Sequence, residues 1–535
     1  MTRPIAGILG LIFVAHASAA YAQHSPNWVH GATCYEVFVR SFYDSDGDGV
    51  GDLKGLTAKL DYINDGNARS TRSLGARCIW LMPIVESPSY HGYDATDYYH
   101  VARAYGTNAD FTQMVAEAHK RGIKVLVDMV LNHTSNEHPW FQAALRDTTS
   151  PYRAWYRWSA TKPDTKGPWG QEVWYKSPIR DEFYYAVFWS GMPDLNYETP
   201  AVRDEVKKIA RFWLEQMHVD GFRLDAVPFL MEDGGKLAGS PGTHALLHDY
   251  ATYVHTVQPN AFTVGEVYDS IGTVLTYYPD QLDSYFAFEV ADSIIAAVRR
   301  GSATGLLAPV LRMQSAVPND RWSPFLRNHD QPRTRTELGG DMARARIASF
   351  LLLTMPGVPF VYYGEEIGMT GAKPDERLRT PMQWRRAPAD GFTTGSPWEV
   401  LQSDSLTATV EAEEGDPRSV LTMNRRLIHL RASNRTLAGG SLMPLRASET
   451  GVAAYARRDG DRVLIIIANL ASTPMRGVEI SSDGGRLPAG TWHVRDLLSG
   501  SIVAPVEIAA DGQLRGYEPL RELSPLEGYV LELSR

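Results

Sequence analysis

The sequence predicts an α/β protein: a (β/α)₈ TIM barrel with an inserted subdomain after strand 3 and a C-terminal antiparallel β-sandwich. Short apolar runs alternate with segments of helical period from about residue 32 to about residue 433, in about eight units. The stretch 134–196 is far longer than a usual strand-to-helix connection, so we interpret it as an insertion. After about residue 436 the pattern changes to alternating strands with tight turns.

The N-terminus has the pattern of a secretory signal peptide over residues 1–22. Residues 1–3 supply a positive charge, 5–15 are mostly apolar, and 20–22 (AYA) form a small-residue cleavage site. A buried N-terminal helix is the alternative, but the apolar run has the length of a signal sequence. We therefore expect a secreted or periplasmic protein. The other long apolar stretch, 347–363, is interrupted by proline and glycine, which predicts a helix and then a strand rather than a membrane span.

The barrel elements follow from hydrophobic periodicity. Three runs are apolar on both faces, as expected for strands of a parallel sheet: 78–82, 125–127 and 360–362. Two segments carry one apolar stripe each and predict helices: 110–120 and 201–217. The expected domains are the signal peptide (1–22), the barrel in two parts (32–133 and 197–435), the inserted subdomain B (134–196) and the C-terminal β-sandwich (436–535).

Composition excludes several classes of protein. Charged residues make up 21% and hydrophobic residues 44%, which is ordinary for a globular chain and unlike a disordered or coiled-coil one. The net charge of −9 argues against a nucleic-acid-binding surface. Only Cys34 and Cys78 are present, too few for a disulfide framework or a Cys-rich zinc site. They are either free thiols or a bridged pair on the first two strands. We predict free thiols, because parallel neighbours seldom offer disulfide geometry.

Four short segments with polar residues stand at the predicted C-terminal ends of strands. The four segments are 128–133 (DMVLNH), 221–226 (GFRLDA), 264–267 (VGEV) and 327–330 (RNHD). Three of them present Asp225, Glu266 and Asp330 at the strand end, where reactive groups of such barrels lie. Any one of these carboxylates could simply cap the next helix. The three together predict a catalytic site.

Two carboxyl groups with different protonation states are what cleavage of a glycosidic bond requires. Asp225 lies two residues after Arg223, so both side chains point to the same side of the strand and the guanidinium should keep Asp225 ionised. Glu266 has apolar neighbours that should keep it protonated. The residues therefore predict Asp225 as nucleophile and Glu266 as general acid/base. Asp330, beside His329, would hold sugar hydroxyls.

An acidic loop at residues 44–52 (DSDGDGVGD) has the spacing of a calcium-binding loop. Its expected ligands are the carboxylates of Asp44, Asp46, Asp48 and Asp52 and the backbone carbonyl of Val50. Position 12 of the loop is Gly55 rather than glutamate, so it departs from an EF-hand. A solvated acidic turn is the alternative, but carboxylates this close repel one another unless a cation joins them. We expect a structural Ca²⁺ here.

The four strand-end segments, together with 80–83 (WLMP), 91–94 (HGYD) and 192–196 (MPDLN), resemble the motif set of the α-amylase family, glycoside hydrolase family 13. The resemblance spans about 400 residues. It implies that Asp225 is the nucleophile, Glu266 the acid/base and Asp330 the transition-state stabiliser. It also implies that Arg223, His133 and His329 contact the sugar and that Tyr93 stacks on it. Asp94 matches a sugar-binding position of exo-acting members.

The resemblance also narrows the expected activity. The MPDLN segment is similar to that of an intermediate group between oligo-1,6-glucosidases and neopullulanases, in which α-amylases occur. We therefore expect a secreted retaining α-amylase acting on α-1,4 bonds of an α-glucan such as starch or maltodextrin. Residues 225–228 (DAVP) and 391–395 (GFTTG) are also similar to trehalose synthases and α-glucosidases. An exo-acting α-glucosidase or oligo-1,6-glucosidase, or a trehalose-synthase-like isomerase, is thus the alternative.

The resemblance also bears on a non-catalytic alternative and on calcium binding. A non-catalytic glucan-binding protein would have lost carboxylates of the triad, and all three are present here. Loops similar to 44–52 hold a structural calcium in oligo-1,6-glucosidases and related enzymes. A second family calcium site would use Asn132 and Asp194, but Phe229 stands where many amylases have a histidine.

Overall fold

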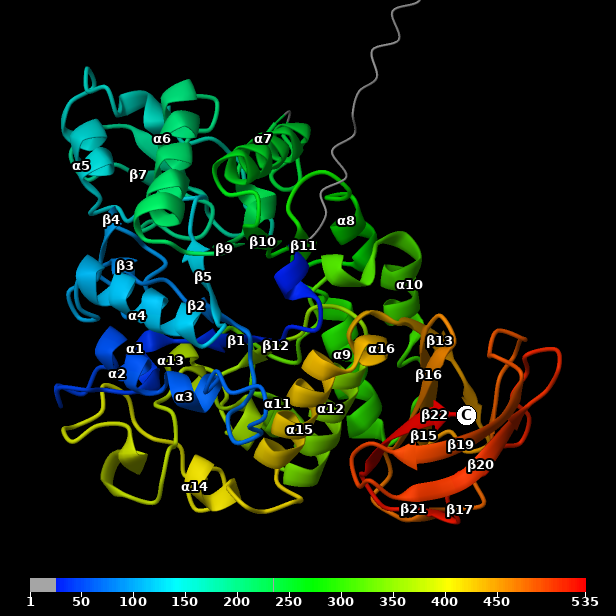
Figure 1. Cartoon of the computed structure of the whole chain (residues 1–535). Helices are drawn as coiled ribbons and strands as arrows, with labels where there is room; N and C mark the ends of the chain where they lie inside the picture. Colours follow the sequence, from blue (N-terminus) through cyan, green and yellow to red (C-terminus); the bar gives the residue numbers. More distant parts are fainter. Residues whose placement is uncertain (1–25, 234) are drawn as a thin grey trace, which may run out of the picture.

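The computed structural model describes residues 26–233 and 235–535, and the signal peptide expected over residues 1–22 lies outside them. A parallel β-barrel and an antiparallel C-terminal sheet lie next to each other (Figure 1). Across the described ranges, no helix combines the length and the apolar character needed to cross a bilayer.

The barrel is a parallel sheet in the order β11-β10-β9-β5-β2-β1-β12. Its strands are β1 (Cys34–Val37), β2 (Cys78–Leu81), β5 (Lys124–Met129), β9 (Gly221–Leu224), β10 (Phe262–Gly265), β11 (Ser284–Tyr285) and β12 (Phe360–Tyr362). An extended segment fills the eighth position between β11 and β12. The N–H of Ser323 donates to the carbonyl of Tyr285 at 3.0 Å, and that of Phe360 donates to the carbonyl of Pro324 at 2.9 Å. Pro324 has no N–H, so this segment makes fewer ladder hydrogen bonds than a regular strand.

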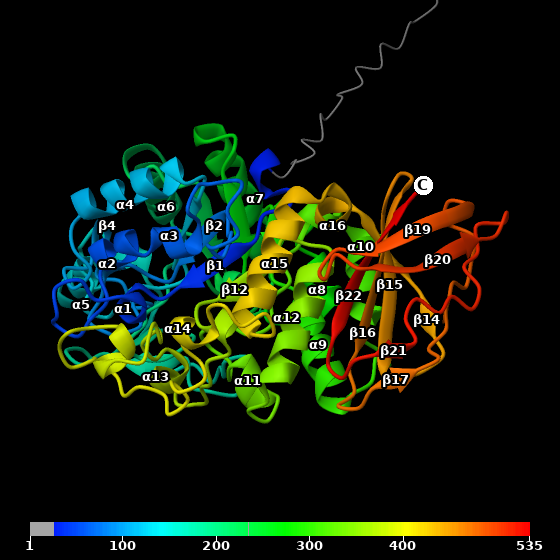
Figure 2. The same cartoon turned by 60° about the horizontal axis from the view of Figure 1, so that its bottom comes forward.

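Helices surround the barrel. The longer ones are α4 (Asn108–Lys120), α6 (Pro200–Arg211), α7 (Pro241–Val257), α9 (Phe288–Arg300), α10 (Ala308–Ala316), α12 (Met342–Thr354) and α15 (Val420–Ser433). Helix α12 is buried on every side from Ala345 to Thr354. It lies between the barrel and the C-terminal sheet in both views (Figures 1 and 2), which explains why its sequence is apolar all round. The helix-then-strand prediction for residues 347–363 is confirmed.

The long connection between β5 and β9 has its own small structure. It contains α5 (Pro139–Arg146) and a three-stranded antiparallel sheet of β6 (Trp158–Ser159), β8 (Phe183–Tyr185) and β7 (Trp174–Lys176). Backbone bridges between His133 and Asp194 and between Tyr156 and Leu195 join its two ends. These bridges fix the insertion over the C-terminal end of β5.

The C-terminal part is a six-stranded antiparallel sheet, with two short two-stranded ladders beside it. Its strands, in sheet order, are β13 (Ser441–Pro444), β15 (Val452–Asp459), β16 (Arg462–Asn469), β22 (Gly528–Ser534), β19 (Gly490–Asp496) and β20 (Ile502–Ile508). Alternate residues of β16 bury opposite faces. Ile466 joins the large core shared with the barrel helices, whereas Ile465 and Ile467 join a separate core with the short ladders.

The prediction of free thiols is wrong. Cys34 on β1 and Cys78 on β2 form a disulfide, the two residues being paired in register with their Cα atoms 4.4 Å apart. Both side chains point into the barrel lumen, where they belong to one apolar cluster. The general scarcity of bridges between parallel strands failed here because two in-register residues that share a face bring their Cα atoms within disulfide distance.

Candidate active site

Side chains that point into the barrel lumen form two successive layers. The lower layer carries no charge: Cys34, Cys78 and Gly221, the first residues of their strands, with Leu126 and Val264. Side chains two residues apart on a strand share a face, so the next lumen positions lie directly above. This upper layer consists of Glu36, Trp80, Asp128, Arg223 and Glu266. The charged groups therefore stand on an apolar base at the C-terminal ends of the strands.

Arg223 is completely buried, and its guanidinium contacts three carboxylates. Its Nη1 lies 2.9 Å from both carboxylate oxygens of Asp128 and 2.7 Å from Oδ1 of Asp225. Its Nη2 lies 2.5 Å from Oε2 of Glu266. One cation thus holds Asp225 and Glu266 side by side at the ends of adjacent strands.

Burial is the largest influence on the pKa values of Asp225 and Glu266. It raises the pKa of Asp225 to about 6, although the Arg223 guanidinium acts in the opposite direction. Burial also raises the pKa of Glu266, and the charge of Asp225 adds to that effect against the pull of Arg223. Glu266 was expected among apolar neighbours only, yet Arg223 contacts it as closely as it contacts Asp225. The two carboxyls are therefore one coupled unit rather than two independent groups.

Asp330 lies across from this pair, between two cations. Its Oδ2 is 3.1 Å from Nε2 of His329, and its Oδ1 accepts from Nη2 of Arg379 at 2.8 Å. Burial acts to raise the pKa of Asp330, but these two cations hold it well below the usual range. Burial likewise acts to lower the pKa of His329, whereas the carboxylates of Asp330 and Glu36 raise it to about 10. Asp330 is thus held as a carboxylate.

The remaining residues expected to contact sugar lie around the same centre. The Tyr93 hydroxyl donates to Asp128 at 3.1 Å and lies 2.7 Å from Nε2 of His329, with the two rings stacked. His133 Nε2 lies 2.9 Å from the backbone carbonyl of Tyr93, and burial lowers the pKa of His133 to about 4, so that it is neutral near pH 7. Asp94 is buried and accepts hydrogen bonds from the hydroxyls of Ser87 and Ser89. All eight predicted catalytic and sugar-contacting residues therefore belong to one region of the barrel mouth.

A cavity of about 860 Å³ opens beside Glu266. Its aromatic walls are Trp169 and Phe188 from the inserted subdomain and Phe229 and Tyr268 from the barrel loops. Trp169 and Tyr268 are 62% and 69% exposed, so the rim is open to solvent. The carboxyl of Glu266 thus faces a space large enough for sugar rings.

Comparison with known proteins agrees with this geometry. Residues 36–440 match the family model described as the catalytic domain of alpha amylase. This chain belongs to the α-amylase family, glycoside hydrolase family 13. It is 38% identical over 467 residues to alpha-amylase 3 of Dictyoglomus thermophilum, covering 86% of this chain and 88% of that protein. It is 34% identical to the trehalose synthase/amylase of Mycobacterium tuberculosis, covering 85% and 84% of the two chains.

A solved structure has the same fold. The crystal structure of alpha-amylase from H. orenii superposes with a TM-score of 0.83 at 39% identity, covering 94% of this chain and 99% of that one. The predicted TIM barrel with a C-terminal β-domain is confirmed, and the protein is a glycoside hydrolase.

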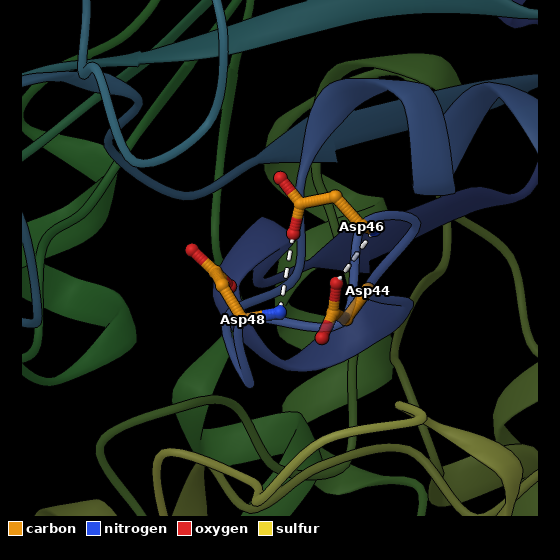
Figure 3. Close-up of side chains that lie close together, drawn as sticks. All are labelled: Asp44, Asp46 and Asp48. Carbon is orange, nitrogen blue, oxygen red and sulfur yellow. Dashed lines mark hydrogen bonds between the residues drawn. The ribbon is translucent and has the colours of Figure 1, made fainter.

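The acidic loop of this family 13 enzyme brings three of its five expected ligands together. One carboxylate oxygen from each of Asp44, Asp46 and Asp48 lies within 4.8 Å of the other two. Figure 3 shows the three side chains close together on the loop. Asp52 lies outside this group, because its oxygens accept from Gly55 at the start of α2 (Leu53–Ala58) and from Ser45. The Val50 N–H donates to Asp48. The loop therefore offers three convergent carboxylates, with Asp52 as a support for the turn.

The second calcium position expected for the family is incomplete. Oδ1 of Asn132 and Oδ2 of Asp194 are buried and have no hydrogen-bond donor in the described ranges. Burial, helped by the nearby charge of Glu232, raises the pKa of Asp194, and Arg157 forms an ion pair with Glu232 at 2.6 Å. Phe229 is part of the cavity wall and offers no side-chain ligand. We assign no metal to this place.

Three residues of the site escaped the sequence reasoning. Asp128 was not predicted to be a site residue, yet its carboxylate contacts the guanidinium of Arg223 as Asp225 and Glu266 do. Glu36 had a visible signal, since it is the single charged residue in the apolar run 34–39. Arg379, in a loop distant in sequence, has no local pattern that marks it. Its contact with Asp330 depends on tertiary structure alone.

Proposed function

We propose that this protein is a secreted α-amylase that hydrolyses α-1,4 bonds of starch and maltooligosaccharides with retention of configuration. The observation that carries the proposal is the placement of Asp225 and Glu266 on the two arms of one buried guanidinium, beside an open cavity. Retaining glycosidases need two adjacent carboxyls of this kind.

The reaction proceeds in two displacements. Glu266, whose pKa is raised by burial, donates its proton to the glycosidic oxygen while Asp225 attacks the anomeric carbon and forms a covalent glycosyl intermediate. Glu266 then removes a proton from water, which displaces Asp225 from the sugar. Arg223 keeps both carboxyls in position throughout.

Positive charge develops on the sugar ring in the transition state of each displacement, and the other residues stabilise it. Asp330 is held ionised by His329 and Arg379, so it faces the oxocarbenium-like ring with a fixed negative charge. We assign Tyr93 to stacking on the sugar and Asp94, His133, Arg223 and His329 to its hydroxyls.

The assigned nucleophile is tested by Asp225→Asn. We expect release of reducing sugar from soluble starch to fall on the order of 10³-fold or more, because no covalent intermediate forms. Asp461→Asn, an exposed aspartate in the C-terminal domain, is the matched control and should retain full activity. Equal rates in both variants would refute the assignment.

The relatives named trehalose synthase/amylase favour a second candidate, an isomerase that keeps the released sugar in the cavity. The product profile distinguishes the activities. An α-amylase yields maltose and longer oligomers, and its first-formed products have the α-configuration by NMR. Glucose as the sole first product would identify an exo-acting enzyme, and trehalose formed from maltose would identify the isomerase.

Export is supported by the disulfide as well as by the N-terminal pattern. A Cys34–Cys78 bridge is stable in oxidising compartments and rare in the cytosol. We expect the mature chain to be recovered outside the cytoplasm, with its N-terminus near residue 23. N-terminal sequencing of the protein from the producing cells tests it.

We also propose that the acidic loop binds a structural Ca²⁺ through Asp44, Asp46 and Asp48, with the Val50 carbonyl. Burial acts to raise the pKa of Asp44, but hydrogen bonds from Thr393 and the backbone of Gly47 and Gly49 outweigh it and lower that pKa. Asp44 thus stays charged. Within the described ranges no lysine, arginine or histidine forms an ion pair with any of the three carboxylates, so a bound cation would supply the missing positive charge.

Chelation tests this metal site. If Ca²⁺ binds, EDTA should lower the melting temperature by a few degrees, and added Ca²⁺ should restore it by mass action. Asp46→Asn/Asp48→Asn should abolish the response to EDTA. An unchanged melting temperature, with metal removal verified by elemental analysis, would count against the site.

A further inference from the structure

A fully buried glutamate lies beneath the active site and takes no part in the proposed reaction. Glu36 on β1 is 2% exposed and belongs to the upper layer of the barrel lumen. Its Oε1 lies 2.5 Å from Nδ1 of His329, on the ring edge that faces away from Asp330. An isolated carboxylate at this depth is strongly destabilising unless a cation accompanies it.

The partners of its two ring nitrogens indicate where the protons of His329 lie. The single hydroxyl proton of Tyr93 is donated to Asp128, so the Tyr93 oxygen accepts from Nε2 of His329, which must carry a hydrogen. Asp330 Oδ2, 3.1 Å away on the same side, is likewise an acceptor. On the other side Nδ1 lies against Oε1 of Glu36. Burial raises the pKa of Glu36 and the His329 ring charge opposes that effect, so when Glu36 is ionised Nδ1 carries the hydrogen between them. A ring with a hydrogen on both nitrogens is an imidazolium.

We propose that Glu36 is a positioning residue that keeps His329 doubly protonated, so that Nε2–H and a fixed positive charge are presented to Asp330 and the sugar. Its consequence for the rate rests on the proposed hydrolase function, whereas the protonation of His329 does not. The residue acts through His329 and touches neither substrate nor reacting atoms.

Other charged groups near His329 set the background against which Glu36 acts. They are Asp128 on β5, Arg223 on β9, Glu266 after β10, Asp330 beside it, and Arg379, whose Nε donates to the His329 carbonyl at 3.0 Å. The two arginines oppose protonation of the ring, and Asp128, Glu266 and Asp330 favour it. Glu36 is the carboxylate that contacts Nδ1, and it therefore decides whether that nitrogen keeps its hydrogen.

The direct test is nitrogen-15 NMR of histidine-labelled protein, with His329 assigned from a His329→Asn sample. In the unsubstituted protein both ring nitrogens should show the protonated signature at pH 8. In Glu36→Gln the titration should move down by about 1–3 pH units, since a neutral amide cannot compensate the ring charge. Glu36→Asp, which keeps the charge, should restore most of that loss.

The functional counterpart is the pH profile of kcat/KM on maltooligosaccharides. The alkaline limb follows the loss of a required proton from Glu266 or from His329, whichever titrates first, so in Glu36→Gln it should move to lower pH by no more than the His329 titration moves. Activity at pH 5–6 should stay close to that of the parent. Glu366→Gln is the matched control. Glu366 is also a buried glutamate, but it accepts from Tyr35 and Tyr62 outside the lumen, so its profile should keep the parental shape.

The protonation of His329 and its effect on the hydrolysis rate are tested separately. A neutral His329 at pH 8 in the unsubstituted protein would overturn it even if Glu36→Gln failed to fold. A doubly protonated ring in Glu36→Gln up to pH 9 would overturn it as well. If the chain hydrolyses no α-glucan, the proposed function fails, while the NMR result for Glu36 still stands or falls by itself.

Discussion

The two layers of the barrel lumen come from the same strands, at positions two residues apart, but they have opposite chemical character. In the lower layer Cys34 and Cys78 form a covalent bridge among Leu126, Val264 and phenylalanine rings. In the upper layer Arg223 is surrounded by carboxylates whose pKa values burial pushes upward. The lower layer favours folding, whereas the upper layer keeps charges where water would be more favourable to them.

This difference explains how one short strand serves both stability and chemistry. Apolar side chains and a disulfide stabilise the folded state whatever the pH. A buried cluster of one cation and several carboxylates is stabilised only while the cation is present, because its removal leaves the carboxylates without compensation. Substitutions in the upper layer should therefore affect activity first, and those in the lower layer should affect stability first.

The largest expected effect is that of Arg223→Met in the upper layer. It leaves Asp128, Asp225 and Glu266 without their common cation, so we expect starch hydrolysis to fall on the order of 10³-fold. The free energy of unfolding should fall by about 3–5 kcal/mol at pH 8. Urea denaturation and a reducing-sugar assay measure both. An active Arg223→Met variant would show that activity does not depend on the charged upper layer, and the contrast between the two layers would be refuted.

The next effect belongs to the lower layer. Cys34→Ala/Cys78→Ala removes a bridge between residues 44 positions apart, which should lower the free energy of unfolding by about 4 kcal/mol. Activity per folded molecule at 25 °C should stay near that of the parent, because no upper-layer group is changed. A loss of activity without a loss of stability would show that the two layers are not separable.

The smallest effect is a pH-dependent gain in stability from Asp225→Asn. The folded-state pKa of Asp225 is about 6, above its ordinary value of 3.8, so the folded protein binds this proton more tightly than the unfolded chain does. The resulting stabilisation is complete below the ordinary pKa and is lost as pH rises through 6. The asparagine variant escapes that loss and should gain up to about 3 kcal/mol over the parent between pH 4 and pH 8.

Thermal denaturation at both pH values measures this gain, with Asp461→Asn as the exposed control. The same difference between variant and parent at pH 4 and pH 8 would mean that Asp225 is not destabilised by its surroundings, which would remove the contrast between the layers at this position.

Much of the fold was predictable from local patterns. The strands at β2, β5 and β12 and the helices α4 and α6 follow from hydrophobic period, and the structure has them within a few residues. The eight proposed catalytic and sugar-contacting residues were found because each stands beside an apolar run or in a short motif. Prediction failed where a contact joins distant segments, as for the Cys34–Cys78 bridge and for Arg379 on Asp330.

By itself, the order of residues determined which side chains enter the lumen, because alternation along a strand fixes the face of Glu36, Arg223 and Glu266. Tertiary structure alone decided which of these side chains touch. Closure of the barrel brought Glu266 onto the same guanidinium as Asp225, and His329 onto Glu36 across 293 positions of sequence. The physical reason is that burial and charge act through space, so the protonation of each carboxyl depends on neighbours that no local pattern contains.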